Sequence, residues 1–477
     1  MNKKNNRKIP TSIEPKMRLK EMFGYGFTDM AGNLLFCTFS QYIVSFYTKV
    51  CGLPEGWAPY SANLILLIAC IMNALLSIVW GSIIDKTRTR FGQARPWFLW
   101  LCIPFAVMTW LAFFLPSFAS GNTPAAFTLG LITYVLAVGG CYTGLSAAMS
   151  AVLPNLTNKD EERVKASSFR MVGGSAGAFI TAMLTVLIVP AIALAIGGNA
   201  ESAEGLKVAY WIVIGMWAVV AGLLLYLAFK WMRERNFQPQ THKAIPFKTS
   251  IKSLKGNHPW FILAGAFIML WIAQTTRSAY ALEFAEEKLG GSQWAMFING
   301  INIVGMISSI LTPMIVTRFK RFNKFNKTST LFLGLLICCV FGALIGTTQS
   351  LNQGIGKTTL FVVFYTLSVF GLQMGMGMFF MMFADTVDYG EWKTHIRAPG
   401  LLASVGAAFG IQMGNAFGFF LPSLIKNSTD IYFTFIYFPV IVYAISGAIM
   451  ILFIPYERKM DMIREDLAKG KYCDSKH

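Results

Sequence analysis

Apolar residues gather into twelve stretches along the chain, separated by shorter polar segments. A helix needs roughly 20 mostly apolar residues to cross a membrane, and each stretch is about that long. The pattern therefore predicts an all-α integral membrane protein with twelve transmembrane helices. The expected spans cover residues 24–48, 61–84, 97–118, 126–153, 167–195, 208–231, 259–283, 293–317, 328–347, 358–384, 399–425 and 431–455.

The longest polar connection divides these spans into six and six. A basic segment also follows the second span of each half, at residues 85–92 and 318–324, which indicates an internal repeat. Duplicated halves are typical of transporters, whose substrate site lies near the midplane between them. We expect an N-terminal six-helix bundle, a cytoplasmic linker, a C-terminal six-helix bundle and a cytoplasmic tail over residues 1–231, 232–258, 259–455 and 456–477.

Composition and charge agree with a membrane protein, because 55% of the 477 residues are hydrophobic and the mean hydropathy is +0.53. If the loops alternate between two faces, one face receives most of the 41 Lys and Arg residues. Cytoplasmic loops carry such an excess, so both termini are expected in the cytoplasm. The net charge of +18 is spread over that face, and we expect no nucleic-acid partner. The other face receives Lys49, Lys207, Lys288, Lys357 and Lys426.

Sequence motifs of nucleotide binding and of hydrolysis are missing from the sequence. No Walker A, Rossmann glycine, HExxH or GxSxG motif occurs in a fitting context, so we expect neither ATP-driven pumping nor an enzyme. The eight cysteines show no C-x-x-C spacing and predict neither disulfides nor a metal site. We expect no cofactor, and the first apolar run is interpreted as a retained span. The remaining hypothesis is transport across the lipid bilayer that is driven by a gradient.

A polar stripe runs along the first span. Tyr25, Asp29 and Asn33 follow one another at a spacing of four, which places them on one helical face. An acid in a span is costly and marks a functional site. Asp29 could accept hydrogen bonds from sugar hydroxyls, carry a coupling proton, or bind another helix as a structural partner.

The fourth and fifth spans add further polar candidates. Ser146 and Ser150 share a face of the fourth span, although small hydroxyl residues also serve as packing contacts between membrane helices. Arg170, at the start of the fifth span, can bind hydroxyl pairs or carboxylates with two donors, or can reach the headgroups.

Arg277 is the cation that lies in the middle of a span, within WIAQTTRSAYAL. A lone cation at this depth must face protein or a water-filled cavity. We expect its partner to be Asp29 across the cavity, or an anionic substrate, and the alternative is an arginine that reaches the outer headgroups.

A charged segment joins the tenth and eleventh spans, at ADTVDYGEWKTHIR. A solvated cytoplasmic loop is the common interpretation of such a segment. Trp392 beside Lys393 could instead offer an aromatic face and a donor to a sugar ring.

Three segments carry a resemblance to a known family. GYGFTD in the first span, RTRFGQARPW after the second and ADTVDYGEWKTHIR before the eleventh resemble the glycoside-pentoside-hexuronide:cation symporters of the major facilitator superfamily. The resemblance covers nearly the whole chain. It implies a major facilitator fold in a bacterial cytoplasmic membrane that imports such a sugar with a cation.

The resemblance also implies roles for individual residues. Asp29 matches the family's sugar-binding acid of the first helix, and Arg170 matches an arginine of the fifth. Lys393 matches the lysine of the eleventh helix, and Trp392 takes the place of an aromatic residue in the same motif. Together with Arg277, the basic residues would suit an anionic sugar such as a uronide.

The implied cation site departs from the family pattern. In the melibiose permease-like branch, the second helix carries two aspartates of a sodium site and the fourth helix a further acid, and here Asn73, Ser77 and Ser146 occupy these positions. Neutral oxygens alone should bind sodium weakly. We therefore favour a proton carried by Asp29 as the coupling ion, or no coupling. A lipid or drug carrier and a membrane sugar sensor are the other hypotheses.

Overall fold

The computed structural model of the chain describes residues 16–54, 58–157, 159–197, 202–235, 254–289, 293–301, 304–320, 326–350, 355–396, 402, 405–425 and 430–473. Within these residues the regular structure is helical, apart from an isolated bridge between Thr89 and Gly92.

The helices before the linker form the N-terminal half. They are α1 (Leu19–Lys49), α2 (Ala62–Lys86), α3 (Pro96–Trp100), α4 (Cys102–Phe114), η1 (Leu115–Ala119), α5 (Thr123–Tyr134), η2 (Val135–Tyr142), α6 (Thr143–Leu156), α7 (Asp160–Ile180), η3 (Thr181–Thr185), α8 (Val186–Gly197) and α9 (Ala203–Trp231). Of the η segments, η1 is a 3-10 helix, whereas η2 and η3 are π-helical.

The helices after the linker form the C-terminal half. They are α11 (His258–Ala279), α12 (Ala281–Leu289), α13 (Gln293–Gly300), α14 (Val304–Lys320), α15 (Asn326–Thr347), η5 (Thr348–Ser350), α16 (Ile355–Thr394), η6 (Val405–Phe409), α18 (Gly410–Ile425), η8 (Phe433–Tyr437), α19 (Phe438–Met450), η9 (Ile451–Phe453), α20 (Ile454–Glu457) and α21 (Met460–Ala468).

Nine helical stretches among the described residues are long and apolar enough to cross a membrane. They correspond to the expected spans two to seven, nine, ten and twelve. The first expected span falls on α1, whereas the eighth and eleventh run partly over residues outside the described part of the chain. The described part of the chain is thus all-helical with about nine candidate spans, and the number twelve stays a prediction. The nine are Ala62–Lys86, Cys102–Ala119, Thr123–Leu156, Glu161–Gly197, Ala203–Trp231, His258–Ala279, Lys327–Ser350, Gly356–Thr394 and Phe433–Glu457.

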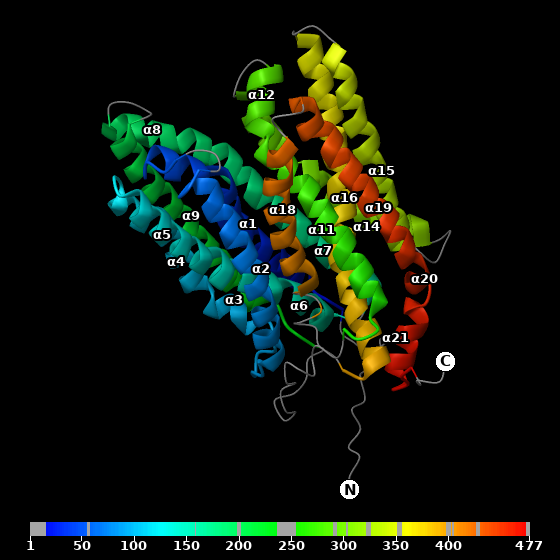
Figure 1. Cartoon of the computed structure of the whole chain (residues 1–477). Helices are drawn as coiled ribbons and strands as arrows, with labels where there is room; N and C mark the ends of the chain where they lie inside the picture. Colours follow the sequence, from blue (N-terminus) through cyan, green and yellow to red (C-terminus); the bar gives the residue numbers. More distant parts are fainter. Residues whose placement is uncertain are drawn as a thin grey trace.

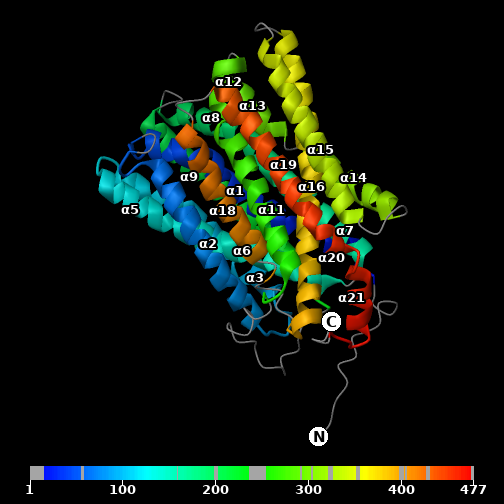
Figure 2. The same ribbon diagram turned by 45° about the vertical axis from the view of Figure 1, so that its right-hand side comes forward.

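The two halves lie side by side. Figures 1 and 2 show α1, α2, α4, α5 and α9 grouped together, with α15, α16 and α19 in a second group beside them. One large cluster of buried hydrophobic side chains is drawn mainly from the N-terminal half, and it also includes Ala384 from beyond the linker. A second cluster belongs to the C-terminal half and takes in Val164 and Met171 of α7. Helix α7 therefore lies at the boundary between the halves.

A buried glutamate follows the last span of each half. Glu234 accepts hydrogen bonds from the backbone N–H groups of Gln93 (3.0 Å) and Ala94 (2.8 Å), just before the third expected span. Glu457 accepts from the backbone N–H groups of Lys327 (2.7 Å) and Thr328 (3.0 Å), at the start of the ninth. The N-terminal end of a helix leaves N–H groups that favour an anion. These matching contacts support the internal repeat.

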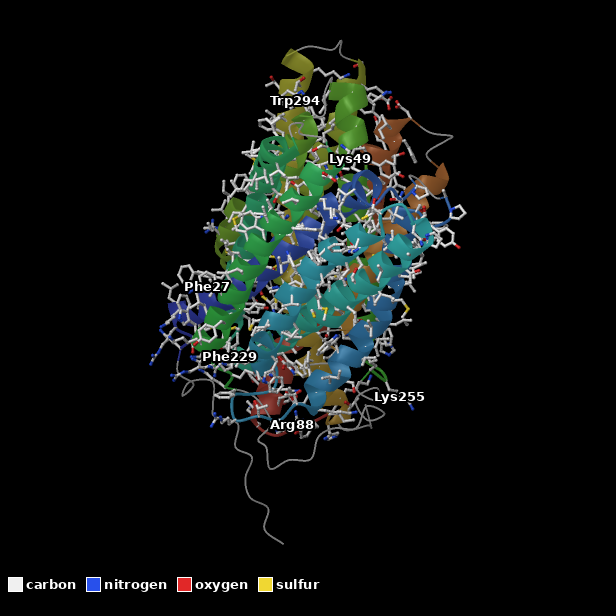
Figure 3. The ribbon with its side chains drawn as sticks, turned by 90° about the vertical axis from the view of Figure 1, so that its left-hand side faces the viewer. Phe27, Lys49, Arg88, Phe229, Lys255 and Trp294 are labelled. Carbon is white, nitrogen blue, oxygen red and sulfur yellow. The ribbon has the colours of Figure 1, made fainter. Side chains whose placement is uncertain are left out.

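One end of the molecule, here called the terminal face, carries α21 and the last turns of α16 (Figures 1 and 2). Arg88 and Lys255 lie toward this end in Figure 3, whereas Lys49 and Trp294 lie toward the opposite end.

Candidate functional site

Helix α1 carries the polar stripe that its sequence predicts. The Asn33 amide donates to the backbone carbonyl of Asp29 (3.0 Å) and to its Oδ1 (3.3 Å). The Cys37 thiol continues the stripe one turn further and donates to Asn33 Oδ1 at 3.6 Å. Cys37 was missed as a candidate, although its spacing of four from Asn33 is visible in the sequence.

Arg170 of α7 meets this stripe. Its Nε lies 3.3 Å from Asp29 Oδ2, and its Nη1 donates to the Tyr25 hydroxyl at 3.4 Å. The Tyr25 hydroxyl in turn donates to the backbone carbonyl of Met149 on α6 (3.2 Å). Asp29 and Arg170 are only 8% and 2% exposed, so each is the principal counterion of the other. The cluster joins three helices of the N-terminal half through one buried ion pair.

Glycines on α7 make this approach possible. A Cβ atom added at Gly173 would collide with the backbone carbonyl of Gly26 on α1, and one added at Gly174 would lie 3.0 Å from Asp29 Oδ2. Helix backbones approach this closely only where side chains are absent. The sequence GGSAG on α7 therefore sets the distance between Asp29 and Arg170.

The C-terminal half closes over Arg170. The guanidinium carbon lies 4.0 Å from the centroid of the Phe380 ring on α16, and 5.9 Å from that of Tyr25. A cation over an aromatic face is stabilised by the ring quadrupole, most strongly where water is excluded. Arg170 therefore contacts both halves, and no sequence signal singled out Phe380 among the 40 phenylalanines of the chain.

The serines of α6 bond within their own helix. The Ser150 hydroxyl donates to the backbone carbonyl of Ser146 at 3.0 Å, and both side chains are buried. An aromatic pair lies nearby, because Tyr142 stacks on Phe36 of α1 with centroids 4.5 Å apart. The structure thus gives Ser146 and Ser150 packing contacts, and their expected role in substrate binding stays a prediction.

Helix α2 carries Asn73 and Ser77, the neutral residues at the expected cation site. The Ser77 hydroxyl donates to the backbone carbonyl of Ala74 (2.6 Å). Asn73 is fully buried, and within the described part of the chain neither its amide nitrogen nor its carbonyl oxygen has a hydrogen-bond partner. Its side chain lies against Gly139 in the π-helical segment η2.

Arg277 does not lie against Asp29, and that expectation is wrong. It is 4% exposed, its Nη1 donates to the Ser368 hydroxyl at 3.2 Å, and its guanidinium carbon lies 4.7 Å from the Tyr365 ring. Both partners belong to α16, so Arg277 points into the C-terminal half. Asp29 is instead engaged by Arg170, which lies on the helix packed directly against α1.

The segment around Trp392 and Lys393 is helical and not a loop. Helix α16 continues to Thr394, because residues 383–391 are buried against neighbouring helices. Lys393 therefore belongs to the tenth span, and its match to the lysine of the eleventh is wrong. Its exposed side chain donates to the Gly256 carbonyl (3.1 Å), while Trp392 packs near Tyr389 with centroids 6.0 Å apart. The structure does not bring these two residues to Asp29.

A second charged cluster joins the halves at the terminal face. Arg163 of α7 lies 2.9 Å from Asp388 and 3.7 Å from Asp385 of α16, with its side chain fully buried. Lys327 of α15 lies 2.6 Å from Asp385. The sequence showed these acids as part of a charged segment, but their partners come from helices far away along the chain.

No metal centre is formed by the residues that the structure describes, in which His, Cys, Asp and Glu side chains do not gather in threes. The contacts within the cluster around Asp29 are hydrogen bonds and one ion pair. An acid, an arginine and a tyrosine hydroxyl together offer both acceptors and donors for hydroxyl groups.

Residues 24–457 match the family described as MFS/sugar transport protein, and the chain belongs to this family of major facilitator transporters. It is therefore a multi-pass membrane transporter of the sugar symporter class and not an enzyme. It is 33% identical over 402 residues to a protein named isoprimeverose transporter from Lactiplantibacillus pentosus, covering 83% of this chain and 78% of that protein.

A further relative and a solved structure are similar to the chain at lower sequence identity. A putative sulfoquinovose importer of Salmonella typhimurium is 27% identical, covering 86% of this chain and 81% of that protein. The fold is similar to that of a bacterial homologue of the iron transporter ferroportin, with a TM-score of 0.65, 18% identity, and 92% of this chain and 99% of that chain covered. That likeness supports the major facilitator fold.

Proposed function

We propose that this protein imports a neutral glycoside together with a proton by alternating access. The observation that carries the proposal is the buried pair of Asp29 and Arg170, which lies within the N-terminal half and is covered by Phe380 of the C-terminal half. Between duplicated halves is where secondary transporters bind their substrates.

The charge of the cluster favours a neutral sugar. The charges of Asp29 and Arg170 neutralise each other, and Arg277 lies among residues of the C-terminal half. The described cluster around Asp29 therefore has no excess positive charge that would bind an anionic sugar. The carboxylate can accept hydrogen bonds from sugar hydroxyls while the guanidinium donates to ring or hydroxyl oxygens. The relative named isoprimeverose transporter supports a glycoside as the substrate class.

Asp29 is the group that we assign to the proton. A buried carboxylate must keep its counterion or take up a proton, because an unpaired charge in this environment is costly. Protonation of Asp29 would break its ion pair with Arg170. The guanidinium could then donate more hydrogen bonds to the substrate. Sodium is less suited to this chain, because Asn73 and Ser77 offer neutral oxygens only.

Alternating access requires the terminal face to open. The contacts of Arg163 with Asp385 and Asp388 join the two halves there and must break when the halves separate. The concentration of Lys and Arg in the loops on this face supports a cytoplasmic location for it and for both termini. In this assignment the structure is closed toward the cytoplasm.

The test is uptake by reconstituted proteoliposomes of labelled isoprimeverose and a labelled glucuronide. Each sugar is offered with an inward proton gradient, an inward sodium gradient, or neither. We expect protons alone to accelerate uptake of the neutral sugar. Acceleration by sodium, or uptake of the glucuronide only, would contradict the proposal. Equal rates in all three conditions would indicate a facilitator, and uptake of neither sugar would favour a lipid or drug carrier.

A further inference from the structure

The C-terminal helix α21 is docked on the end of α16. Met460, Ile463 and Leu467 form its buried face and cluster with Tyr389 and Trp392 of α16. Beyond the helix, the backbone N–H of Cys473 donates to the Trp392 carbonyl at 2.9 Å. Figures 1 and 2 both show α21 beside the lower end of α16. The tail is therefore an ordered part of the terminal face.

Arg464 projects from the docked side of α21, one turn after Met460. Its Nη2 lies 2.6 Å from Asp385 Oδ1, and its Nε lies 3.6 Å from Asp388 Oδ2. The side chains of Asp385 and Asp388 are 0% and 6% exposed. The tail thus supplies a cation to two buried carboxylates of a membrane helix.

The same two carboxylates bind Arg163 of the N-terminal half. Arg163 and Arg464 both approach Asp388 Oδ2, at 2.9 Å and 3.6 Å, and both approach Asp385 Oδ1, at 3.7 Å and 2.6 Å. Lys327 holds the other oxygen of Asp385 at 2.6 Å. Three cations therefore share two carboxylates, and the positive charges of Arg163 and Arg464 repel each other across one pair of acceptors.

Arg163 must move away from the two acids when the halves separate, whereas Lys327 and Arg464 need not. Arg163 is anchored to the N-terminal half, where its Nε donates to the Thr157 carbonyl at 3.0 Å, so it must leave the acids. Lys327 and Arg464 belong to the C-terminal half and stay. A buried carboxylate that loses its counterion is strongly destabilised. A cation that stays, as Arg464 does, would reduce that cost in the open state, and in the closed state it would weaken the attraction of Arg163 to the same acids.

We propose that Arg464 is a positioning residue for transport, the counterion that Asp385 and Asp388 keep when Arg163 departs. It thereby shifts the equilibrium toward opening of the terminal face. The inference rests on the alternating access of the proposed function, but not on the identity of the sugar or of the coupling ion. A conformational measurement without substrate separates the two.

The experiment uses the full chain in lipid nanodiscs, with fluorophores attached through unnatural amino acids at Lys165 of α7 and Lys459 beside α20. Both residues are exposed and lie on opposite sides of the boundary between the halves. Energy transfer between the fluorophores reports the ratio of open to closed molecules. In Arg464→Gln we expect this ratio to fall about five-fold, which corresponds to about 1 kcal/mol for the loss of one of several cations that share the two acids.

Two controls separate charge from folding. Arg464→Lys keeps the cation and should restore most of the ratio. Lys469→Gln removes a cation of the same segment, whose side chain is 63% exposed and lies 3.8 Å from Glu465 at the surface, and should leave the ratio unchanged. Hydrogen exchange of residues 460–468 verifies that α21 remains docked in each variant.

The decisive comparison adds Arg163→Gln. Without Arg163 no cation leaves Asp385 and Asp388 when the halves separate, since Lys327 and Arg464 both belong to the C-terminal half, so Arg464→Gln should no longer lower the ratio. The proposal is overturned if Arg464→Gln raises the ratio or leaves it unchanged while α21 stays docked. It is equally overturned if the effect is as large without Arg163 as with it.

Discussion

The guanidinium group of Arg170 lies against the ring of Phe380, 4.0 Å from its centroid, and this contact crosses the boundary between the halves. Seven residues earlier on α7, Arg163 contacts Asp388 of the same helix α16. The two helices therefore meet twice, once beside the candidate sugar site and once at the terminal face. Helix α7 therefore carries both the arginine that pairs with Asp29 and the arginine that joins the halves at the terminal face.

Replacement of Asp29 tests the centre of the site. Asp29→Asn removes the ion pair with Arg170 and the group that we assign to the proton. We expect proton-driven accumulation of sugar to fall about ten-fold or more, because the variant lacks the carboxyl that carries the proton and also loses a charged hydrogen bond with Arg170. Uptake into proteoliposomes measures this. Asp461→Asn, which removes an exposed acid of the tail, is the matched control. Normal accumulation in Asp29→Asn would rule out its role as proton carrier.

The contact of Phe380 with Arg170 should depend on the aromatic face. We expect Phe380→Leu to destabilise the closed state by about 0.5–2 kcal/mol, whereas Phe380→Tyr should keep most of it. Energy transfer across the terminal face, as above, gives the difference. Phe379→Leu is the control, because that ring packs on Phe267 and makes no described contact with a cation. Equal effects of Phe379→Leu and Phe380→Leu would show that only packing matters.

Gly173 allows α1 and α7 to touch. Gly173→Ala places a methyl group against the Gly26 carbonyl, so the helices must separate and the distance from Asp29 to Arg170 must grow. We expect a loss of stability of about 1–3 kcal/mol and a matching loss of sugar affinity. Gly140→Ala is the control, since open space surrounds that position. Thermal unfolding and sugar binding in detergent provide the two measurements, and an unchanged affinity in Gly173→Ala would contradict the argument.

Asn73 is a buried amide that makes no described hydrogen bond. Replacing an unsatisfied polar group by an apolar one of similar shape is neutral or stabilising. We therefore expect Asn73→Leu to raise the free energy of unfolding by up to about 1 kcal/mol, measured by thermal unfolding. A loss of stability in this variant would mean that the amide holds a water or an ion in the native protein.

Glu234 makes the stability of the N-terminal half depend on pH. Burial raises the pKa of the Glu234 carboxyl above its ordinary value of 4.5, although hydrogen bonds from Gln93, Arg95, Ala94 and Asn155 oppose the shift. The folded state therefore holds this proton at pH values where the unfolded chain has lost it. The stabilisation that results is complete below pH 4.5 and is lost as the pH rises through the folded-state pKa.

Glu234→Gln isolates this effect. The melting temperature of the native protein, relative to that of the variant, should fall as the pH rises from about 4.5 and then level off. Because the amide nitrogen of Gln cannot accept from the backbone, the variant should be less stable by about 1–3 kcal/mol. A difference that rises with pH over this range would reverse the assigned shift.

The sequence by itself determined the class of the protein. Apolar stretches of span length require helices, since a membrane offers no partner for backbone N–H and C=O groups. Spacing along one helix also placed Tyr25, Asp29 and Asn33 on one face, because a helix has a fixed period. These relationships are local in the chain, and the resemblance of GYGFTD and DYGEWK to known symporters extended them to the family.

Tertiary structure alone decided which charges meet. Asp29 pairs with Arg170, 141 residues away, whereas Arg277 binds Ser368 and faces Tyr365. Asp388 pairs with Arg163, 225 residues away, and the burial of its surroundings keeps the end of α16 helical where its charge suggested a loop. Composition records how many charges a helix carries but not which neighbour it packs against. That choice is made by close packing, as at Gly173, where the absence of one side chain brings two helices together.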